Sequence, residues 1–296
     1  MKTKALLATY GAVLLLLTGA AYAAGSAVGP FSPTAGGHAH GHGGDHGHGG
    51  ADEQPGGLAS SSGGYRLSPI DDAQPEFIVG AAADFAYRIT GSGGATVTAF
   101  DVEHDKRMHL IVVRRDTTGF QHVHPEMAAD GTWRVPLALP AAGTYRAFAA
   151  FTPTGGRPLT LGVDLFAPGT FEPVAHQPTR IAEVDGYTVD LAGEPVPGEA
   201  SPLTLTVRKD GQPVTDLEPY LGAYGHLVAL RESDLAYLHV HPEGAPGDGR
   251  APAGPVIEFI AEVPSAGSYR LFLDFAHAGV VRTADFTVAT PGHGGR

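Results

Sequence analysis

Short runs of alternating apolar and polar residues recur along most of the chain. Residues 84–89 (DFAYRI), 143–148 (GTYRAF) and 203–208 (LTLTVR) place every second side chain on one apolar face. This period of two is typical of a half-buried β-strand, and glycine, proline and aspartate separate successive runs. Residues 95–100 (ATVTAF) are predicted to pair with 84–89 across a hairpin loop at 91–94. The pattern predicts an all-β protein made of β-sandwiches.

A group of histidines occurs twice, 117 residues apart. His109, His122 and His124 recur as His226, His239 and His241, and the words FQHVHPE and YLHVHPE surround the later members of each set. Residues 139–148 (LPAAGTYRAF) also match 263–272 (VPSAGSYRLF). A similar composition alone would not give the same spacing between equivalent residues, so the chain contains an internal duplication.

The duplication divides the chain into two tandem β-sandwich domains. We place the first repeat at 65–168 and the second at 180–290, with a linker at 169–179 and a tail at 291–296. Residues 31–64 are rich in glycine, histidine and serine and lack apolar periodicity, so they predict a disordered linker. Each repeat has about 100 residues, which is enough for one hydrophobic core.

Residues 1–30 have the features of an export segment. Lys2 and Lys4 precede a long apolar run that ends near Ala21-Tyr22-Ala23, a small-residue pattern suited to signal cleavage. The apolar run is also long enough to remain as a membrane anchor. Both alternatives place the rest of the chain outside the cytoplasm, secreted or anchored to the cell membrane.

The repeated histidines predict a metal site in each copy. In a strand, residues i and i+2 share a face, so His122 and His124 project together, as do His239 and His241. The proline that follows each pair places it near a strand end or sheet edge. A hairpin can bring the first histidine of each copy, His109 or His226, alongside.

Three neutral imidazoles suit Cu(II) or Zn(II), and copper is favoured by its intrinsic affinity for nitrogen ligands. The sequence has no cysteine and three methionines, which leaves few soft ligands for Cu(I). A structural role of the histidines in hydrogen bonding is the alternative.

Other histidines and two glutamates are further candidates for roles in metal binding. His104 is a candidate fourth ligand in the first copy and His277 in the second, or both are incidental. Glu126 and Glu243 either orient an imidazole from outside the metal shell or cap a turn. A dense tract in the predicted linker binds metal ions loosely or is simply a polar spacer; its members are His38, His40, His42, His46 and His48.

Charge and missing motifs exclude several classes of function. The formal net charge of −12 argues against binding to nucleic acid or to anionic lipid surfaces. The sequence contains no Gly-x-Ser-x-Gly elbow, no phosphate-binding loop and no His-Glu-x-x-His helix, and it offers no cysteine nucleophile. We therefore expect a binding protein and not an enzyme.

Residues 104–126, 139–148, 220–243 and 263–275 together resemble a family of secreted or membrane-anchored actinobacterial proteins described as heavy-metal-binding or YtkA-like. The resemblance implies two immunoglobulin-like or cupredoxin-like β-sandwich domains outside the cytoplasm, in a protein that handles copper. The predicted function is sequestration or delivery of a transition metal, with metal ions and an envelope metal-handling protein as partners. The alternative is a structural or partner-binding envelope protein with histidines that are not ligands.

Overall fold

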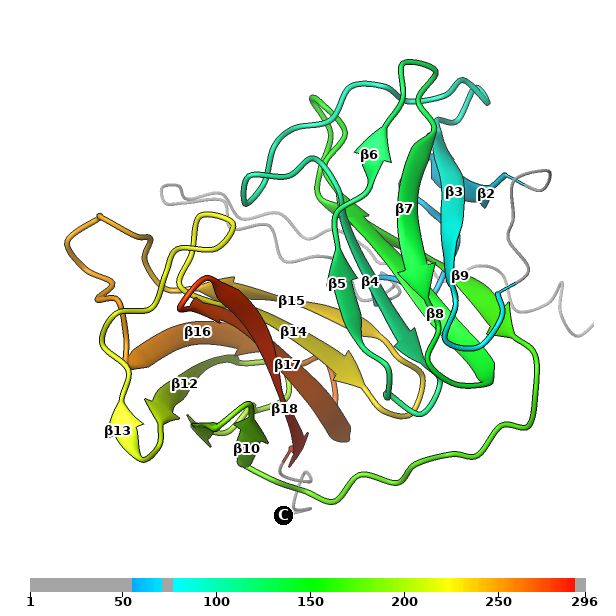
Figure 1. The fold of residues 1–296 in the computed structure, drawn as a ribbon. Coiled ribbons are helices and arrows are strands. Elements are labelled where there is room, and N and C mark those ends of the chain that lie inside the picture. The colour runs from blue at the N-terminus through cyan, green and yellow to red at the C-terminus, as the bar shows by residue number, and fades with distance from the viewer. Residues whose placement is uncertain (1–54, 71–76, 291–296) are drawn as a thin grey trace, which may run out of the picture. The chain divides into compact units, whose positions relative to one another are not determined.

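The structure is a computed structural model that describes residues 55–70 and 77–290. The predicted export segment 1–30, the histidine tract at 38–48 and the tail 291–296 lie outside the described residues. Every regular element in the described part is a β-strand, as predicted. The strands form two tandem repeats of one sandwich architecture, which confirms the predicted all-β fold (Figure 1). No helix there is long and apolar enough to cross a membrane.

The first repeat contains two antiparallel sheets. One has the strand order β1-β2-β3-β7-β6 and the other the order β5-β4-β8-β9. The strands are β1 (Ser61–Ser62), β2 (Tyr65–Pro69), β3 (Ala82–Thr90), β4 (His109–Arg114), β5 (Gln121–Val123), β6 (Glu126–Met127), β7 (Trp133–Ala138), β8 (Gly143–Phe151) and β9 (Leu159–Ala167).

The second repeat contains the equivalent strands in one continuous sheet path. Its order is β10-β11-β12-β16-β15-β14-β17-β18, and β13 pairs with β12. The strands are β10 (Ile181–Val184), β11 (Tyr187–Ala192), β12 (Ala200–Lys209), β13 (Gln212–Pro213), β14 (His226–Arg231), β15 (Tyr237–Pro242), β16 (Val256–Glu262), β17 (Ser268–His277) and β18 (Val280–Ala289).

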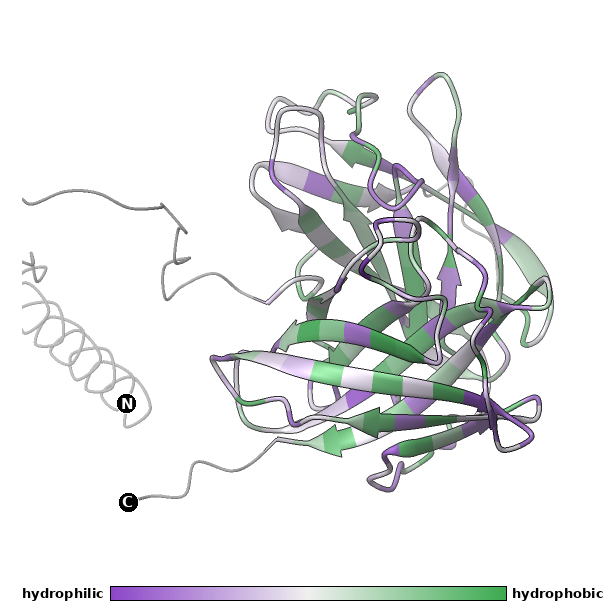
Figure 2. Ribbon diagram, turned by 90° about the vertical axis from the view of Figure 1, so that its left-hand side faces the viewer, coloured by the Kyte–Doolittle hydropathy of each residue, from purple (hydrophilic) through white to green (hydrophobic). Residues whose placement is uncertain are grey.

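The alternation along the strands fills one core in each repeat (Figure 2). In the first repeat Phe85, Tyr87 and Ile89 of β3 are fully buried against Trp133 of β7. Leu203, Leu205 and Val207 of β12 occupy the corresponding positions in the second. Burial of such side chains contributes roughly 1.5–3 kcal/mol each, so the cores account for the stability of a chain without disulfides.

Two local predictions were wrong. Residues 95–100 form isolated bridges at Thr96 and Phe100 instead of a strand, although the predicted hairpin loop is present and the Val97 N–H donates to Ile89 O at 2.8 Å. The fold also begins before the predicted boundary at Tyr65, because the Gly57 N–H donates to Thr160 O of β9 at 2.9 Å. A Cβ on Gly57, whose φ is +78°, would lie 2.2 Å from the Phe148 ring, so this close passage of the backbone requires glycine.

The strand that carries the His-x-His pair differs between the repeats. In the first repeat it breaks at His124 and Pro125, so β5 pairs with β4 and β6 pairs separately with β7. In the second repeat β15 is continuous through Pro242 and pairs with β14 and then with β16. Pro242 is nevertheless the last residue of β15, which fits the predicted position of the pair near a strand end.

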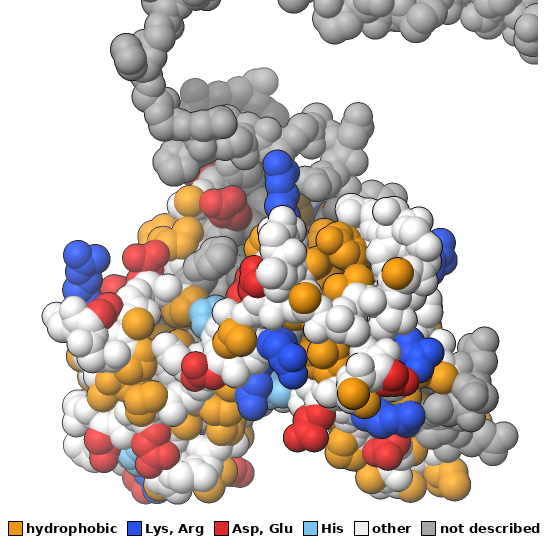
Figure 3. All heavy atoms as spheres, turned by 90° about the horizontal axis from the view of Figure 1, so that it is seen from above, with side chains coloured by type: hydrophobic (Ala, Val, Ile, Leu, Met, Phe, Trp, Pro, Cys, Tyr) orange, Lys and Arg blue, Asp and Glu red, His pale blue; other side chains and the backbone are white. Residues whose placement is uncertain are grey.

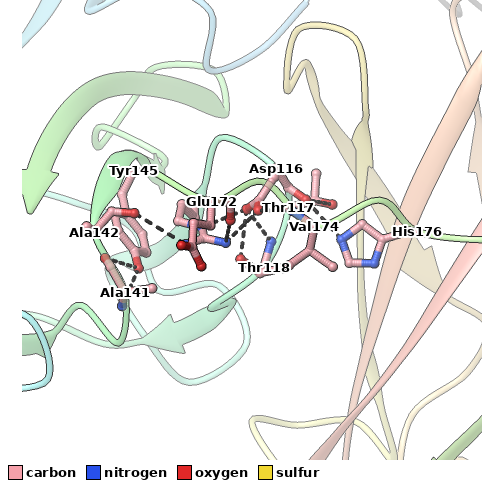
Figure 4. Close-up of polar contacts among 10 residues, drawn as sticks. Asp116, Thr117, Thr118, Ala141, Ala142, Tyr145, Glu172, Val174 and His176 are labelled. Atoms are coloured by element: carbon pink, nitrogen blue, oxygen red, sulfur yellow. Dashed lines mark hydrogen bonds and ion pairs between the residues drawn. The ribbon is translucent and has the colours of Figure 1, made fainter. Parts of the chain in front are cut away.

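The predicted linker 169–179 has no strand and is fastened to the first repeat (Figure 4). Asp116 accepts a bidentate pair of hydrogen bonds from Arg114, at 2.8 and 2.6 Å, and both side chains are buried. Asp116 Oδ2 also accepts from the Val174 N–H at 2.8 Å, and the His176 Nε2–H donates to Asp116 O at 2.9 Å. These bonds fix the path of the linker.

The hydrogen bond from His176 has a testable effect on stability. We expect His176→Ala to lower the free energy of unfolding by about 1 kcal/mol, the usual contribution of one partly buried hydrogen bond. Gln177→Ala, at an exposed neighbouring position, is the control and should change stability by less than about 0.5 kcal/mol. Urea unfolding measures both, and equal effects of the two variants would contradict the role given to His176.

The repeats share a third apolar cluster, which we call the inter-repeat cluster. Strand β4 is apolar on both faces, because Leu110 and Val112 enter the core of the first repeat while Ile111 and Val113 face the second. The full set of buried members is Ile111, Val113, Phe148, Val228, Leu230, Leu235 and Phe272, with Phe120 and Tyr237 packed against it. The two repeats therefore contact each other through hydrophobic faces of equivalent sheets.

Candidate metal centre

A tight turn orients the first histidine of the first repeat. Glu103 and Lys106 pair across a turn in which His104 and Asp105 have φ of 48° and 63°. The turn presents Glu103 O to His109, whose Nε2–H donates to it at 3.0 Å. A carbonyl oxygen can only accept, so Nε2 carries the proton and His109 Nδ1 is left with a free lone pair.

The second repeat contains the same device. Tyr220 and Ala223 pair across a turn in which Leu221 and Gly222 have φ of 51° and 72°. The His226 Nε2–H donates to Tyr220 O at 2.9 Å. The turn and its hydrogen bond are thus preserved in both copies although the turn residues differ, and His226 also has Nδ1 as its free nitrogen.

His122 reaches this region from the neighbouring strand. It lies on β5 directly across from Ile111 of β4. Its Nδ1 is 2.8 Å from Asp274 Oδ2, a buried carboxylate of β17 in the second repeat. Since the carboxylate accepts, His122 donates from Nδ1 and keeps the lone pair on Nε2.

The free nitrogens of His109 and His122 face each other. His109 Nδ1 and His122 Nε2 are 3.1 Å apart, which is a hydrogen-bond distance. However, His109 carries its proton on Nε2, which donates to Glu103 O, and His122 carries its proton on Nδ1, which donates to Asp274. Two lone pairs at this distance repel unless a cation lies between them. Nitrogen ligands about 2.0–2.1 Å from a tetrahedral metal are themselves roughly 3.3 Å apart. The pair is therefore spaced as two ligands of one ion.

His124 provides a third nitrogen. Its ring centroid lies 5.0 Å from that of His109 and 4.9 Å from that of His122. His124 Nε2 is buried and has no hydrogen-bond partner among the described residues. One nitrogen from each of the three histidines lies within 4.8 Å of the others, and this is the one group of at least three candidate ligands found in the described part. We call these three residues the histidine triad.

Burial keeps the imidazoles of His109, His124 and His226 neutral. Loss of hydration, reinforced by repulsion from neighbouring imidazoles, lowers the pKa of His109 from 6.5 to about 4 and that of His124 to about 3. The same causes lower the pKa of His226 to about 4. A neutral imidazole is the form that binds a metal, so protons compete weakly at neutral pH.

The lowered pKa of His226 makes stability depend on pH. Below about pH 6.5 the unfolded chain takes up a proton at this residue while the folded chain stays neutral until about pH 4. Above pH 6.5 His226 therefore leaves the free energy of unfolding unchanged. Below pH 6.5 it lowers the free energy of unfolding by up to about 1.4 kcal/mol for each unit of pH.

We expect His226→Gln, which keeps an amide donor for Tyr220 O, to reduce the slope of the unfolding free energy against pH between pH 6 and 4.5; His109 and His124 account for the slope that remains. Denaturant unfolding at each pH, with a chelator present, measures the slope for the variant and the wild type. Parallel curves would contradict the buried neutral state of His226.

The remaining predicted ligands divide into near and distant ones. His104 lies between the copies, with its ring centroid 5.1 Å from that of His226 and 6.3 Å from that of His109. His277 faces away from Asp274 on β17; its Nδ1 is 2.6 Å from Tyr187 Oη and its Nε2 is 3.1 Å from Asp216. Residues three apart on a strand face opposite sides, so this placement favours the alternative that His277 is incidental to the second histidine set.

Two predicted ligands and the two predicted outer partners, Glu126 and Glu243, are not part of the described triad. The side chains of His239 and His241 lie outside the described part, although their backbone forms β15. Glu126 begins β6 and is exposed, and Glu243 follows β15 and is also exposed.

Acidic and basic side chains are interspersed over the visible face in Figure 3, where histidine occupies only small areas.

Sequence reasoning missed Asp274 and the meeting of the two repeats. His226 and Asp274 are directly opposite each other in register, and the corresponding pair in the first repeat is His109 and Ala150. The sequence signal was a lone carboxylate on an otherwise apolar strand, LFLDFAH. Strand alternation alone does not reveal that this carboxylate contacts a histidine of the other repeat.

A family described as "Domain of unknown function (DUF8832)" matches residues 61–166 and 182–292. The chain belongs to this family. Its two matched segments coincide with the two repeats, and its description assigns no activity. No curated protein matches the chain. The predicted likeness to heavy-metal-binding proteins therefore stays a prediction.

Solved structures show only loose likeness. Invasin, a bacterial integrin-binding protein, is 12% identical with a TM-score of 0.23, over 77% of this chain and 39% of that one. A putative membrane-anchored protein from Corynebacterium diphtheriae is 9% identical with a TM-score of 0.22, over 78% and 60%. The chain thus spans less than two thirds of either. The Ig1-2 module of the Drosophila receptor phosphatase DLAR is 10% identical with a TM-score of 0.20, over 77% and 98%.

Proposed function

We propose that the protein binds a transition-metal ion, Cu(II) or Zn(II), at the histidine triad. The observation that carries the proposal is the 3.1 Å approach of His109 Nδ1 and His122 Nε2, both of which are left with lone pairs by their outer hydrogen bonds. The unpartnered Nε2 of His124 supports it, since a buried polar atom without a partner is costly.

The ligand set favours Cu(II) or Zn(II) over harder and softer ions. Three imidazoles and no thiolate suit both metals, and Cu(II) binds nitrogen ligands more tightly. The triad leaves at least one coordination position for a solvent molecule or an exchanging ligand. Such an open set fits a protein that takes up and releases a metal ion.

The proposed setting is outside the cytoplasm. The apolar segment after Lys2 and Lys4 supports export, whether it is cleaved or kept as an anchor, and the absence of cysteine leaves histidine as the main transition-metal ligand. In this setting the tract at 38–48 captures metal loosely and the triad holds it for sequestration or for delivery to an envelope partner.

A structural role of the histidines is the second candidate. The His122–Asp274 hydrogen bond joins the two repeats without any metal. In that role the triad would stabilise contact between the repeats in an envelope protein that binds no ion.

Metal titration separates the two candidates. The reference protein is the full chain with the five tract histidines replaced by serine, which removes loose binding. Cu(II) and Zn(II) are added in separate titrations, followed by gel filtration and elemental analysis. Replacing His109, His122 and His124 together by alanine should lower the retained metal by one equivalent.

His277→Ala is the matched control, because His277 is engaged by Tyr187 and Asp216 away from the triad. It should retain as much metal as the reference protein. Equal retention by the triad variant and the reference, or no retention by either, would reject the proposed function.

A further inference from the structure

We propose that Asp274 of the second repeat is a positioning residue for the metal site of the first repeat. This inference rests on the proposed function and identifies a group outside the triad that prepares it. In this assignment Asp274 does not bind the metal. It holds the proton of His122 on Nδ1 and thereby directs the Nε2 lone pair toward His109 and His124.

The contacts of Asp274 support this assignment. Its Oδ2 accepts from His122 Nδ1 at 2.8 Å and its Oδ1 accepts from Thr283 Oγ1 at 2.6 Å, so both oxygens are used. Thr283 lies directly across from Asp274 on β18, which fixes the carboxylate from within the second repeat. A carboxylate hydrogen-bonded to the outer nitrogen of a ligating histidine sets its tautomer and raises its basicity.

The charge balance of Asp274 points the same way. Its side chain is 5% exposed, and among the described residues it contacts His122 and forms no ion pair with a lysine or arginine. Asp116, which is also strongly buried, is paired with Arg114. A buried carboxylate without a lysine or arginine partner is costly, and a cation bound next to His122 would compensate it.

The two repeats differ at this position. The register partner of the first histidine is Ala150 in the first repeat and Asp274 in the second. The first repeat therefore supplies the triad without a carboxylate of its own at that position, and the second supplies the carboxylate. In this proposal the metal centre needs residues from both repeats. The two repeats therefore do not form two equivalent metal sites.

The test uses the full chain and two variants of Asp274. Asp274→Ala installs the residue that the first repeat carries at the equivalent position. Asp274→Asn keeps the size and one acceptor oxygen but removes the charge. Asp216→Asn is the matched control, because it alters the other histidine–aspartate contact of the second repeat, which lies away from the triad. Circular dichroism and thermal unfolding establish that each variant is folded.

The first readout is the tautomer of His122 in the metal-free protein, measured by long-range proton–nitrogen NMR. We expect the Nδ1–H form in the wild type and in Asp216→Asn, and a mixture or the Nε2–H form in Asp274→Ala. This readout does not depend on metal binding. An unchanged tautomer in folded Asp274→Ala would overturn the inference.

The second readout is affinity for Zn(II) and the electron paramagnetic resonance spectrum with Cu(II). Asp274→Ala should bind about 10–100-fold more weakly and show altered copper parameters, and Asp274→Asn should lie between it and the wild type. Wild-type affinity and spectrum in Asp274→Ala, while a His124→Ala chain loses binding, would overturn the inference and leave the proposed function intact. Absence of binding in the wild type would reject the proposed function instead.

Discussion

Phe272→Ala is expected to lower the free energy of unfolding by about 3–5 kcal/mol. Phe272 lies in the inter-repeat cluster, is 2% exposed and stacks on Phe120 of the first repeat with ring centroids 4.1 Å apart and an interplanar angle of 5°. Alanine would leave a cavity between two sheets that each already pack against their own core. The surrounding side chains could collapse into it only by shifting one repeat against the other.

Urea unfolding of the full chain measures this loss. Phe166→Ala is the control, because Phe166 is 61% exposed and its loss should cost less than about 1 kcal/mol. A double-mutant cycle with Phe120→Ala isolates the ring contact, which should contribute about 0.5–1.5 kcal/mol beyond burial. A loss for Phe272→Ala no larger than that for Phe166→Ala would mean that the repeats do not depend on this contact.

The inter-repeat cluster is built from equivalent positions of the two copies. Phe120 stacks on Phe272, and the corresponding residues of the opposite repeats, Tyr237 and Phe148, lie 5.7 Å apart. Reciprocal contacts of this kind define an isologous interface, as in a two-fold dimer. The duplicated chain therefore joins two copies through one self-complementary face. The same contact brings together His109 and His226, the first residues of β4 and β14.

Local patterns were enough to predict the repeats and the all-β fold. Alternation in 84–89 and 203–208 corresponds to β3 and β12, and the constant spacing of the repeated histidines places β4 and β14 at equivalent positions. The proximity of His122 and His124 was expected from their spacing, although β5 ends at Val123, and the predicted hairpin brings His109 near. These are relations within one strand or between neighbouring strands, which a sequence pattern can express.

Relations across the inter-repeat contact were not predictable from these patterns. The run His109-Leu-Ile-Val-Val113 indicates a strand buried on both faces, but not that one face meets the second repeat. Likewise, Asp274 lies 152 residues from His122, and no local pattern relates the two. His104, an alternative fourth ligand by spacing, lies in a left-handed turn where its neighbour is His226 of the other copy. Each of these three placements depends on contact between the two repeats.

Zn(II) is expected to stabilise the folded chain against unfolding by about 4 kcal/mol at a free concentration one thousand times the dissociation constant. The triad nitrogens come together only in the folded chain, because His109 is held by Glu103 O and His122 by the second repeat. Binding to the folded state alone therefore shifts the folding equilibrium by mass action. The unfolded chain also binds zinc through scattered histidines, which reduces the effect, so the measurement uses the chain with the tract histidines replaced by serine.

Thermal unfolding with and without Zn(II) measures this shift, and excess chelator should restore the metal-free midpoint. His124→Ala is the decisive variant, because His124 Nε2 has no hydrogen bond among the described residues that the substitution would remove. The metal-dependent rise should shrink strongly in this variant, while the metal-free midpoint should change less than in Phe272→Ala. If Zn(II) raised the midpoint equally in both proteins, the stabilising ion would be bound elsewhere. Agreement between the metal-dependent shift and the directly titrated affinity would tie the stabilisation to the histidine triad.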